Sequence, residues 1–467
     1  MKNNRLTVNY LYLLIGISLL LLFISVSDAY TPYTHSNKNK MGFSNLSAIY
    51  NKKSERSNPD TLRLAGVSDD LLFWFSGFTD AKGNFLITLD RFFVKFIFKI
   101  SLHIDDLEVI NTIRSKLKIG RVTVEDSHNC CSFIVKNYAE IKNVICPLFK
   151  GFPLHTSKIL DFEDFNKAVL IKDYINKDLS YAEMERIISL KNGMNSKREN
   201  FTHQVNNSQI IINPNWLIGF IEGEGTFGIK TGSALYLQIA QKNTSQETLN
   251  AITTFLTKLH NGALQDSKIL PLTVVSTINV KTNVVSLVVN SVDSLYYYVL
   301  PYLDSSNMYT RKAMDFKLWR AALLLRIQGY YFLPSGKRLF LKISDTINKR
   351  YSTRSSSNID GIIIEIFEQY QTILAKNPPF DVRANIPHTD NVRKLSITNR
   401  SEKPITVYVY ENKNMVKGSP FASYSAVHKS LGLKPSSNTC NRYIDTDRLY
   451  KNKYIFSSKP IDSTSKV

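Results

Sequence analysis

Cysteine is scarce in this sequence, with four residues among 467. Cys130 and Cys131 are adjacent, whereas Cys146 and Cys440 stand alone, so the set has neither the spacing of a zinc site nor that of a disulfide framework. We therefore expect four reduced thiols inside the protein, and we exclude the disulfide-stabilised and zinc-finger classes of protein.

Acidic residues are under-represented relative to basic ones. Asp and Glu total 39 against 59 Lys and Arg, which gives a formal net charge of +20 and an isoelectric point near 9.5. An excess of this size favours a polyanionic partner, above all nucleic acid. A protein whose positive charge serves only solubility is the alternative.

Long hydrophobic runs are also rare, but one uncharged stretch stands out near the N-terminus. Residues 11–26 read LYLLIGISLLLLFISV and follow Lys2 and Arg5. Their length falls just short of a full membrane span. The stretch fits a signal peptide ending near Ala29, a single membrane span, or sequence translated from an upstream reading frame. We expect membrane contact through residues 11–26.

The middle of the chain contains an internal repeat. FSGFTDAKGNF at residues 75–85 is matched by LIGFIEGEGTF at residues 217–227. Further on, residues 132–165 align without a gap with residues 286–319. Each copy reads as a small-residue helix, two strands, a helix, two strands, a proline-broken segment and a last helix. The prediction is an α+β protein with two αββαββα repeats around a pseudo-twofold axis.

The repeat sets the expected domain boundaries. A connector helix is predicted after Ser180, which forms a capping box with Glu183, and another helix near residues 359–374. The expected units are 1–65 (hydrophobic segment and linker), 66–175 (first repeat), 176–213 (connector), 214–330 (second repeat), 331–403 (linker with one helix) and 404–467 (C-terminal unit).

Small residues in the two repeated helices predict a close helix pair. Gly77 and Ala81 are four residues apart, as are Gly219 and Gly223, so each pair shares one helix face and allows two backbones to approach. Gly83 and Gly225 follow directly, where we expect the left-handed conformation that often ends a helix. The predicted helix-interface set is Gly77, Ala81, Gly83, Gly219, Gly223 and Gly225.

Glu224 is not explained by helix packing. A carboxylate in the last helical turn faces the negative end of the helix dipole and loses a few tenths to about 1 kcal/mol. Acids at two adjacent helix ends would also repel each other, and a divalent cation such as Mg²⁺ removes that conflict. The position therefore predicts metal-assisted hydrolysis of a phosphodiester, with a solvated glutamate as the alternative.

FSGFTDAKG and LIGFIEGEG resemble the two motifs of the LAGLIDADG homing endonucleases, of the fungal mitochondrial intron-encoded type. The resemblance covers residues 71–326. It implies a saddle of two four-stranded sheets in the major groove of a long, asymmetric double-stranded DNA site. It also implies that the acid before each terminal glycine binds a metal ion at one scissile phosphate. Some family members act as maturases, which help to splice their own intron RNA.

The first motif departs from the family pattern. Lys82 stands where the second metal-binding acid would be and cannot bind Mg²⁺. The expected metal-binding set is Glu224 with Asp80 and Glu222, although Asp80 lies on a different side of its helix. The enzyme could nick one strand through Glu224, cut both strands by using Lys82 to neutralise a phosphate, or only bind.

Two further lysines recur in the repeat, Lys158 in T-S-K and Lys312 in T-R-K. The resemblance implies that a lysine near this point contributes to the pocket around the attacking water. A phosphate contact is the alternative. Asp161 and Asp315, which follow, are expected to support the first turns of their helices. The predicted catalytic residues are Glu224, Lys82, Lys158 and Lys312.

The strands are expected to form the DNA-recognition surface. Basic residues alternate with apolar ones in the first repeat, so one strand face is basic and the other packs against helices. A merely solvated face would show the same alternation. The predicted DNA contacts are Arg91, Lys95 and Lys99 in the first repeat, and Lys230, Tyr236, Gln238 and Lys242 in the second.

The C-terminal unit reads as a helix-turn-helix pattern, with two short helices joined by a glycine turn. Ser423 or Ser425 can begin a helix that runs to Leu431 and ends at Gly432, and Ser436 or Ser437 can begin a second one. The segment resembles nuclease-associated modular DNA-binding domains. Its expected DNA contacts are Lys429, Lys434, Asn441 and Arg442. A small accessory or protein-binding tail is the alternative.

The leading interpretation is a monomeric, mitochondrial, Mg²⁺-dependent endonuclease specific for one double-stranded DNA site. An intron RNA maturase that has lost cleavage is the second, and Lys82 is the residue that favours it. A DNA-binding regulator on the same scaffold is the third. Dependence on divalent metal separates the enzyme from the two binding proteins.

Overall fold

The computed structural model describes most of the chain from residue 67 onward. The described ranges are 67–90, 93–174, 179–201, 210–230, 234–259, 268–348, 359–400 and 406–461, with 413, 435, 436, 438 and 447 left out of the last. The stretch at 11–26, and with it the predicted membrane contact, lies outside these ranges. Within them, no helix has both the length and the apolar composition needed to cross a bilayer.

The first half follows the predicted order of elements. These are α3 (Asp69–Lys82), β1 (Gly83–Asp90), β2 (Phe93–His103), α4 (Leu107–Leu117), β3 (Arg121–Glu125), β4 (Cys130–Val135) and α7 (Lys158–Tyr174). The strands pair antiparallel in the order β1-β2-β4-β3. Val94, Phe96 and Phe98 of β2 are buried, because residues two apart share one face of a strand and this face packs against helices.

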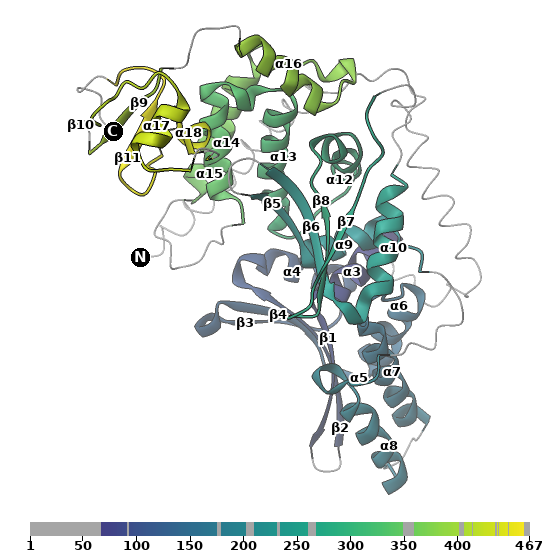
Figure 1. Ribbon diagram of the computed structural model, residues 1–467. Coiled ribbons are helices and arrows are strands. Elements are labelled where there is room, and N and C mark those ends of the chain that lie inside the picture. The colour runs from purple at the N-terminus through teal and green to yellow at the C-terminus, as the bar shows by residue number, and fades with distance from the viewer. Residues whose placement is uncertain are drawn as a thin grey trace, which may run out of the picture. The chain divides into compact units, whose positions relative to one another are not determined.

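The second half repeats this plan. Its elements are α9 (Pro214–Glu224), β5 (Gly225–Lys230), β6 (Ala234–Lys242), α10 (Gln246–Thr257), β7 (Val275–Asn279), β8 (Val284–Val289) and α13 (Lys312–Ile327). The sheet order is β5-β6-β8-β7, the counterpart of the first sheet. The α+β fold with two αββαββα repeats is therefore confirmed, and α3 and α9 lie side by side where the halves meet (Figure 1).

The predicted proline-broken segment is instead a continuous helix in both halves. Residues 138–151 run through α5 (Tyr138–Glu140), a wide π-helical turn (Ile141–Ile145) and α6 (Cys146–Gly151). Residues 292–304 do the same through α11 (Val292–Ser294), a π turn (Leu295–Val299) and α12 (Leu300–Asp304). Pro147 and Pro301 are each the second residue after the wide turn, in the first turn of α6 or α12, where a missing backbone N–H is tolerated.

The region after the second half contains more helix than the sequence indicated. We expected one helix near residues 359–374, which is α15 (Ile359–Leu374), but α14 (Pro334–Thr346) and α16 (His388–Arg400) are also present. Pro334 lies at the start of α14, a typical helix-start position that the polar composition of the region obscured. The connector helix is α8 (Tyr181–Asn192), and its capping box is formed as predicted.

The two halves share one hydrophobic core, which also takes in α14 and α15. The C-terminal unit has a core of its own, which includes Val409, Val427 and Phe456. All four cysteines are free thiols, as expected, and Cys131, Cys146 and Cys440 are buried. Burial raises the pKa of the Cys146 thiol to about 12, so this thiol stays protonated and unreactive.

The C-terminal unit is more than two helices. It contains α17 (Tyr424–Ser430) and α18 (Thr439–Tyr443) beside a sheet of β9 (Tyr408–Glu411), β10 (Asn414–Met415) and β11 (Tyr454–Ser457) in the order β10-β9-β11. Ser423 caps α17, and Gly432 has the left-handed φ of +62°. The helical prediction is therefore correct but incomplete, because the short strands gain stability only by pairing with each other.

Candidate nucleic-acid interface and cleavage site

Helices α3 and α9 touch along their small residues. A Cβ atom on Gly77 would lie 1.9 Å from a backbone carbonyl oxygen of α9, and one on Gly219 would lie 2.0 Å from a carbonyl oxygen of α3. A Cβ atom on Gly223 would lie 2.1 Å from the Cβ atom of Ala81. These are the close approaches that the spacing of the small residues predicts, and they bring the two helix ends together.

The glycines that end these helices differ from the prediction. Gly83 (φ −75°, ψ 158°) and Gly225 (φ −73°, ψ 155°) are extended, so the predicted left-handed cap is wrong. Each chain passes directly from helix into strand at this residue. Glycine is needed for space, since a Cβ atom would lie 2.9 Å from the Thr79 carbonyl oxygen in one half and 2.7 Å from that of Ile221 in the other.

Lys82 and Glu224 form an ion pair where the two helices end. Lys82 Nζ lies 3.1 Å from Glu224 Oε1, and the side chains are 36% and 25% exposed. The lysine suits the negative C-terminal end of α3, whereas the glutamate opposes that of α9. The pseudo-twofold axis relates these two positions, so unlike charges meet where two acids would repel.

Asp80 serves the first half as a structural anchor. Its side chain is almost completely buried and accepts hydrogen bonds from the backbone N–H groups of His155 (2.7 Å) and Thr156 (3.1 Å). The Thr156 hydroxyl (2.6 Å) and the Trp216 indole N–H (3.0 Å) donate to it as well. Burial raises the pKa of the carboxyl, and the Thr156 hydroxyl acts in the opposite direction. Asp80 thus joins the loop before α7 to both motif helices.

Glu222 does the same for the second half. It accepts hydrogen bonds from the backbone N–H groups of Tyr309 (3.0 Å) and Thr310 (2.6 Å) and from the Trp74 indole N–H (2.6 Å). These donors occupy the carboxylate oxygens of both acids, so the geometry does not support the expectation that Asp80 and Glu222 join Glu224 as metal ligands. Among the three motif acids, Glu224 alone reaches the surface at the helix ends.

The two repeated lysines lie beside these helix ends. Lys158 Nζ donates to the carbonyl oxygen of Gly83 (2.5 Å), and Lys312 Nζ donates to that of Gly225 (2.6 Å). Burial lowers the pKa of both amines. The carboxylates of Asp80 and Glu224 act in the opposite direction on the pKa of the Lys158 amine. Each lysine is therefore placed within reach of the junction between a motif helix and its first strand.

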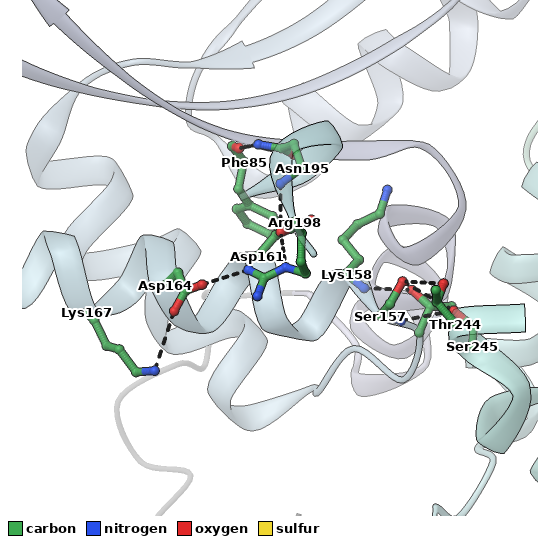
Figure 2. Close-up of polar contacts among 11 residues, drawn as sticks. Phe85, Ser157, Lys158, Asp161, Asp164, Lys167, Asn195, Arg198, Thr244 and Ser245 are labelled. Carbon is green, nitrogen blue, oxygen red and sulfur yellow. Dashed lines mark hydrogen bonds and ion pairs between the residues drawn. The ribbon is translucent and has the colours of Figure 1, made fainter. Parts of the chain in front are cut away.

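An asparagine in the connector, for which the sequence analysis made no prediction, fixes this junction in the first half. Asn195 Nδ2 donates to the carbonyl oxygen of Phe85 (2.9 Å), and its backbone N–H donates to Asp161 Oδ1 (2.9 Å). Arg198 bonds to Asp161 (2.9 Å) and to Asp164 (2.7 Å) in the same cluster (Figure 2). The cluster ties strand β1 to helix α7, which carries Lys158 at its start.

Asn348 makes the corresponding contacts in the second half. Its Nδ2 donates to the carbonyl oxygen of Phe227 (2.8 Å), and its backbone N–H donates to Asp315 Oδ1 (2.9 Å). Both asparagines have a left-handed φ, +57° for Asn195 and +61° for Asn348. Asp161 and Asp315 therefore bind these asparagines rather than only supporting their own helix turns, as we had expected. The short similarity of N-S-K-R to N-K-R was the available sequence signal.

The sheet faces opposite the helices, here called the open faces, carry the predicted polar residues. Lys95 and Lys99 lie on the open face of β2, and Lys95 pairs with Asp90 at 2.5 Å. Arg91 lies outside the described residues. In the second half, Lys230 is 5.4 Å from the centre of the Tyr236 ring. The open face of the second sheet also carries Gln238 and Lys242.

Glu224 fits a partly hydrated divalent cation. No group of three or more His, Cys, Asp or Glu side chains suited to a metal ion occurs in the described ranges. Mg²⁺ is commonly bound by one or two carboxylates together with phosphate oxygens and water, so one exposed glutamate beside DNA suffices. Lys82 offers no ligand at the matching position, and the donor set therefore fits one cation rather than two.

The predicted contacts of the C-terminal unit are on its surface. Lys429, Lys434 and Arg442 are exposed, while the side chain of Asn441 lies outside the described set. The unit is attached to α14 by bonds to backbone carbonyls, from Lys337 Nζ to Ile444 O (3.3 Å) and from Arg448 Nη2 to Leu341 O (2.9 Å).

Comparisons with known proteins place these features in a family context. The LAGLIDADG endonuclease family model matches residues 75–169 and 217–323, which are the two halves. The uncharacterized mitochondrial protein RF1 of Saccharomyces cerevisiae is 26% identical over 84% of this chain and 83% of its own length. The probable intron-encoded endonuclease Cox1-I1b of Schizosaccharomyces pombe is 29% identical over 33% of this chain and 40% of its own length.

Solved structures share the fold of the two halves. I-GzeII, a LAGLIDADG homing endonuclease in complex with its DNA target, covers 60% of this chain and 99% of its own, with a TM-score of 0.50 and 23% identity. I-LtrWI, a LAGLIDADG homing endonuclease bound to target DNA, covers 60% and 98%, with a TM-score of 0.52 and 18% identity.

Proposed function

This chain belongs to the LAGLIDADG endonuclease family, and from that premise we propose that it is a site-specific endonuclease for double-stranded DNA. Two sheets with basic open faces, a net charge of +20 and a family match over both halves support DNA as the substrate. The observation that carries the proposal is the Lys82–Glu224 pair at the helix ends. It places an acid that can bind a metal cation next to a lysine that cannot.

We propose that cleavage proceeds at Glu224 alone. LAGLIDADG endonucleases depend on a divalent metal, and Mg²⁺ is the ion that one carboxylate, phosphate oxygens and water would bind best. When bound, the ion would activate water and neutralise charge on the phosphate. Glu224 would hold it at one strand. Lys82 can neutralise a phosphate but cannot bind a metal ion, so the product is a nick in one strand.

Lys158 and Lys312 are proposed to act beside the DNA phosphates at the two helix ends. Each amine donates to a carbonyl oxygen at the start of a strand, and burial lowers the pKa of each. Such an amine can donate a hydrogen bond to a water or to a phosphate oxygen without leaving its own helix. Burial is the main cause of the lowered pKa of the Lys158 amine, and the carboxylates of Asp80 and Glu224 oppose it.

The remaining assignments extend the DNA interface. We propose that Lys95, Lys99, Lys230, Gln238 and Lys242 face the major groove of a long asymmetric site, and that the C-terminal unit adds contacts through Lys429 and Arg442. One chain supplies both halves, so a monomer is sufficient. A mitochondrial location is proposed because the relatives include a mitochondrial protein and intron-encoded endonucleases.

A supercoiled plasmid tests the proposed cleavage. The plasmid carries as its target the host-gene sequence from which the intron is absent. It is incubated with the full chain and Mg²⁺. The supercoiled, open-circular and linear forms are then separated. We expect open circles from the wild type and none from Glu224→Gln, which keeps the shape of the side chain but loses its charge. Without Mg²⁺ the plasmid should stay supercoiled.

The other products separate the alternatives. Linear DNA from the wild type would show that both strands are cut in spite of Lys82. Binding without any break in the DNA would refute the endonuclease proposal. Preferential binding of structured intron RNA over the DNA target would then favour a maturase.

A further inference from the structure

A hollow of about 410 Å³ opens beside Lys82. Its walls come from both halves of the molecule, since Ser101 and His103 of β2 face Arg311 and Lys312 at the start of α13. Ser101 and His103 share the face of β2 that carries Lys95 and Lys99, because residues two apart along a strand point to the same side. A DNA backbone that follows the open face inward would therefore reach the hollow.

The lining of the hollow is strongly basic. It includes Lys82, Arg311 and Lys312 as well as two histidines, against the acids Asp106 and Glu222. Both acids are already occupied. Glu222 accepts the N–H donors described above, and Asp106 Oδ1 accepts the backbone N–H of Arg311 at 2.9 Å. Three cationic side chains thus face two acids in the lining, and Lys82 is also paired with Glu224 at its edge.

The Arg311 side chain is the least well paired group in this lining. Its Nε lies 3.9 Å from Asp106 Oδ2, which is too far for a hydrogen bond. The same nitrogen is buried and has no hydrogen-bond partner among the described residues. The Arg311 side chain as a whole is 21% exposed, and guanidinium groups bind phosphate oxygens readily.

The pseudo-twofold axis supplies an internal comparison. Ser157 corresponds to Arg311, and its backbone N–H bonds to Ser245 Oγ (3.1 Å) just as that of Arg311 bonds to Asp106 (Figure 2). The backbone is therefore the same on both sides, while the side chains differ. One side has Glu224 and Ser157, and the other has Lys82 and Arg311. Both differences add positive charge to the same side.

We propose that this hollow binds one DNA phosphodiester through Lys82, Arg311 and Lys312 without a metal ion, and that this phosphate belongs to the uncut strand. The inference rests on the proposed function for its ligand, DNA. It adds that the two helix ends have different roles. The end with Glu224 cleaves DNA, and the end with Lys82 only binds a phosphate.

Binding measured in EDTA tests the hollow separately from cleavage. Fluorescence anisotropy of the full chain with labelled target duplex, and with an unrelated duplex, is followed across a range of KCl concentrations. Arg311→Ser introduces the residue that the other half has at position 157, and the backbone bond to Asp106 remains. Arg311→Lys keeps the charge. Lys258→Gln is the charge-matched control, since Lys258 is exposed at the end of α10, which packs on the opposite face of the sheet.

Arg311→Ser should weaken binding to both duplexes about tenfold, the value of one charged hydrogen bond. The slope of log K against log salt should fall by about 1, because the variant neutralises one phosphate fewer and phosphates carry no sequence information. Arg311→Lys should retain the slope, and Lys258→Gln should bind like the wild type. Circular dichroism checks folding, and Arg311→Gln replaces the serine variant if that variant unfolds.

Two results would overturn the inference. The first is wild-type affinity in Arg311→Ser, and the second is a decrease in affinity no larger than that of Lys258→Gln. Either result, together with intact nicking, would refute phosphate binding in the hollow but not the proposed cleavage. If the wild type never nicks DNA and Arg311→Ser still binds more weakly, phosphate binding in the hollow would be supported and the proposed cleavage refuted.

Discussion

At the scale of single residues, two equivalent positions at the helix ends carry opposite charges. Lys82 and Glu224 are equivalent by pseudo-symmetry and meet at 3.1 Å. Asp80 and Glu222 are equivalent as well, and both are buried anchors. Motif acids therefore have two separate roles in this fold, and burial, rather than residue type, separates the anchors from the acid that can reach DNA.

Lys82→Glu should convert the proposed cleavage of one strand into cleavage of both strands. The substitution supplies a carboxylate at each helix end, so each strand gains a position for a divalent cation. Linear plasmid should appear in Mg²⁺. In EDTA the two acids oppose both helix dipoles and each other, so thermal unfolding should show a loss of about 1 kcal/mol that Mg²⁺ restores.

Lys82→Gln is the matched control for this change. It removes the same positive charge without offering a ligand, and it should give open circles only. The interpretation fails if Lys82→Gln also yields linear DNA, or if Lys82→Glu yields none while the protein stays folded.

At the scale of elements, the helix pair determines where the site is. The backbones of α3 and α9 are close enough that side chains are excluded at Gly77 and Gly219. This approach places the helix ends, and so Lys82 and Glu224, next to each other. The strands begin at the following residue, which fixes the open faces relative to the site.

Gly77→Ala should destabilise the protein by forcing the helices apart. The new Cβ atom would overlap a backbone carbonyl oxygen, which no side-chain rotation can relieve, so we expect a loss of about 1–3 kcal/mol or more. Gly151→Ala is the control, since nothing lies within 4 Å of the added atom. Chemical denaturation of both variants checks the prediction, and equal stabilities would contradict it.

Asn195 and Asn348 should stabilise their halves through their side-chain amides. Asn195→Gly and Asn348→Gly keep the left-handed backbone but leave the Phe85 and Phe227 carbonyl oxygens without this donor. We expect a loss of about 1–3 kcal/mol for each. Hydrogen exchange of β1 and β5 locates the effect. Each variant should loosen its own strand, and a loss of protection spread evenly over both halves would contradict the assignment.

At the scale of the whole molecule, the described residues form more than one hydrophobic core. The two halves and helices α14 and α15 form one core, whereas the C-terminal unit has its own. A unit with an independent core can add affinity for DNA without changing the geometry of the cleavage site. The net charge of +20 acts on the entire DNA backbone in either case.

A double substitution tests the C-terminal unit. Lys429→Gln with Arg442→Gln should weaken DNA binding and lower the salt slope by about 2, because each of the two positions no longer neutralises a phosphate. Nicking at saturating protein should remain unchanged. Lys417→Gln, in the turn after β10, controls for charge. Unaltered affinity in the double variant would show that the unit does not bind DNA.

Much of the fold could be predicted from the sequence because the same pattern of helices and strands occurs in both halves. The alternation in β2 and the small residues of α3 and α9 are local patterns, and the repeat confirmed each in a second copy. Helix α14 was missed although its buried residues Gly336, Leu339, Phe340 and Ile343 recur three or four positions apart, so the helical pattern was available in the sequence and the interspersed charged residues obscured it.

The sequence by itself determined the two repeats, the helix pair, the basic strand faces and the loss of an acid at Lys82, since each depends on residue type and spacing. Only the tertiary structure decided which acids are buried, that Asn195 and Asn348 fix the first strands, and that Arg311 shares a hollow with Lys82. These facts depend on residues far apart in the chain, such as Lys82 and Arg311, which are 229 positions apart and line the same hollow. Residues so far apart along the chain produce no periodic pattern in the sequence.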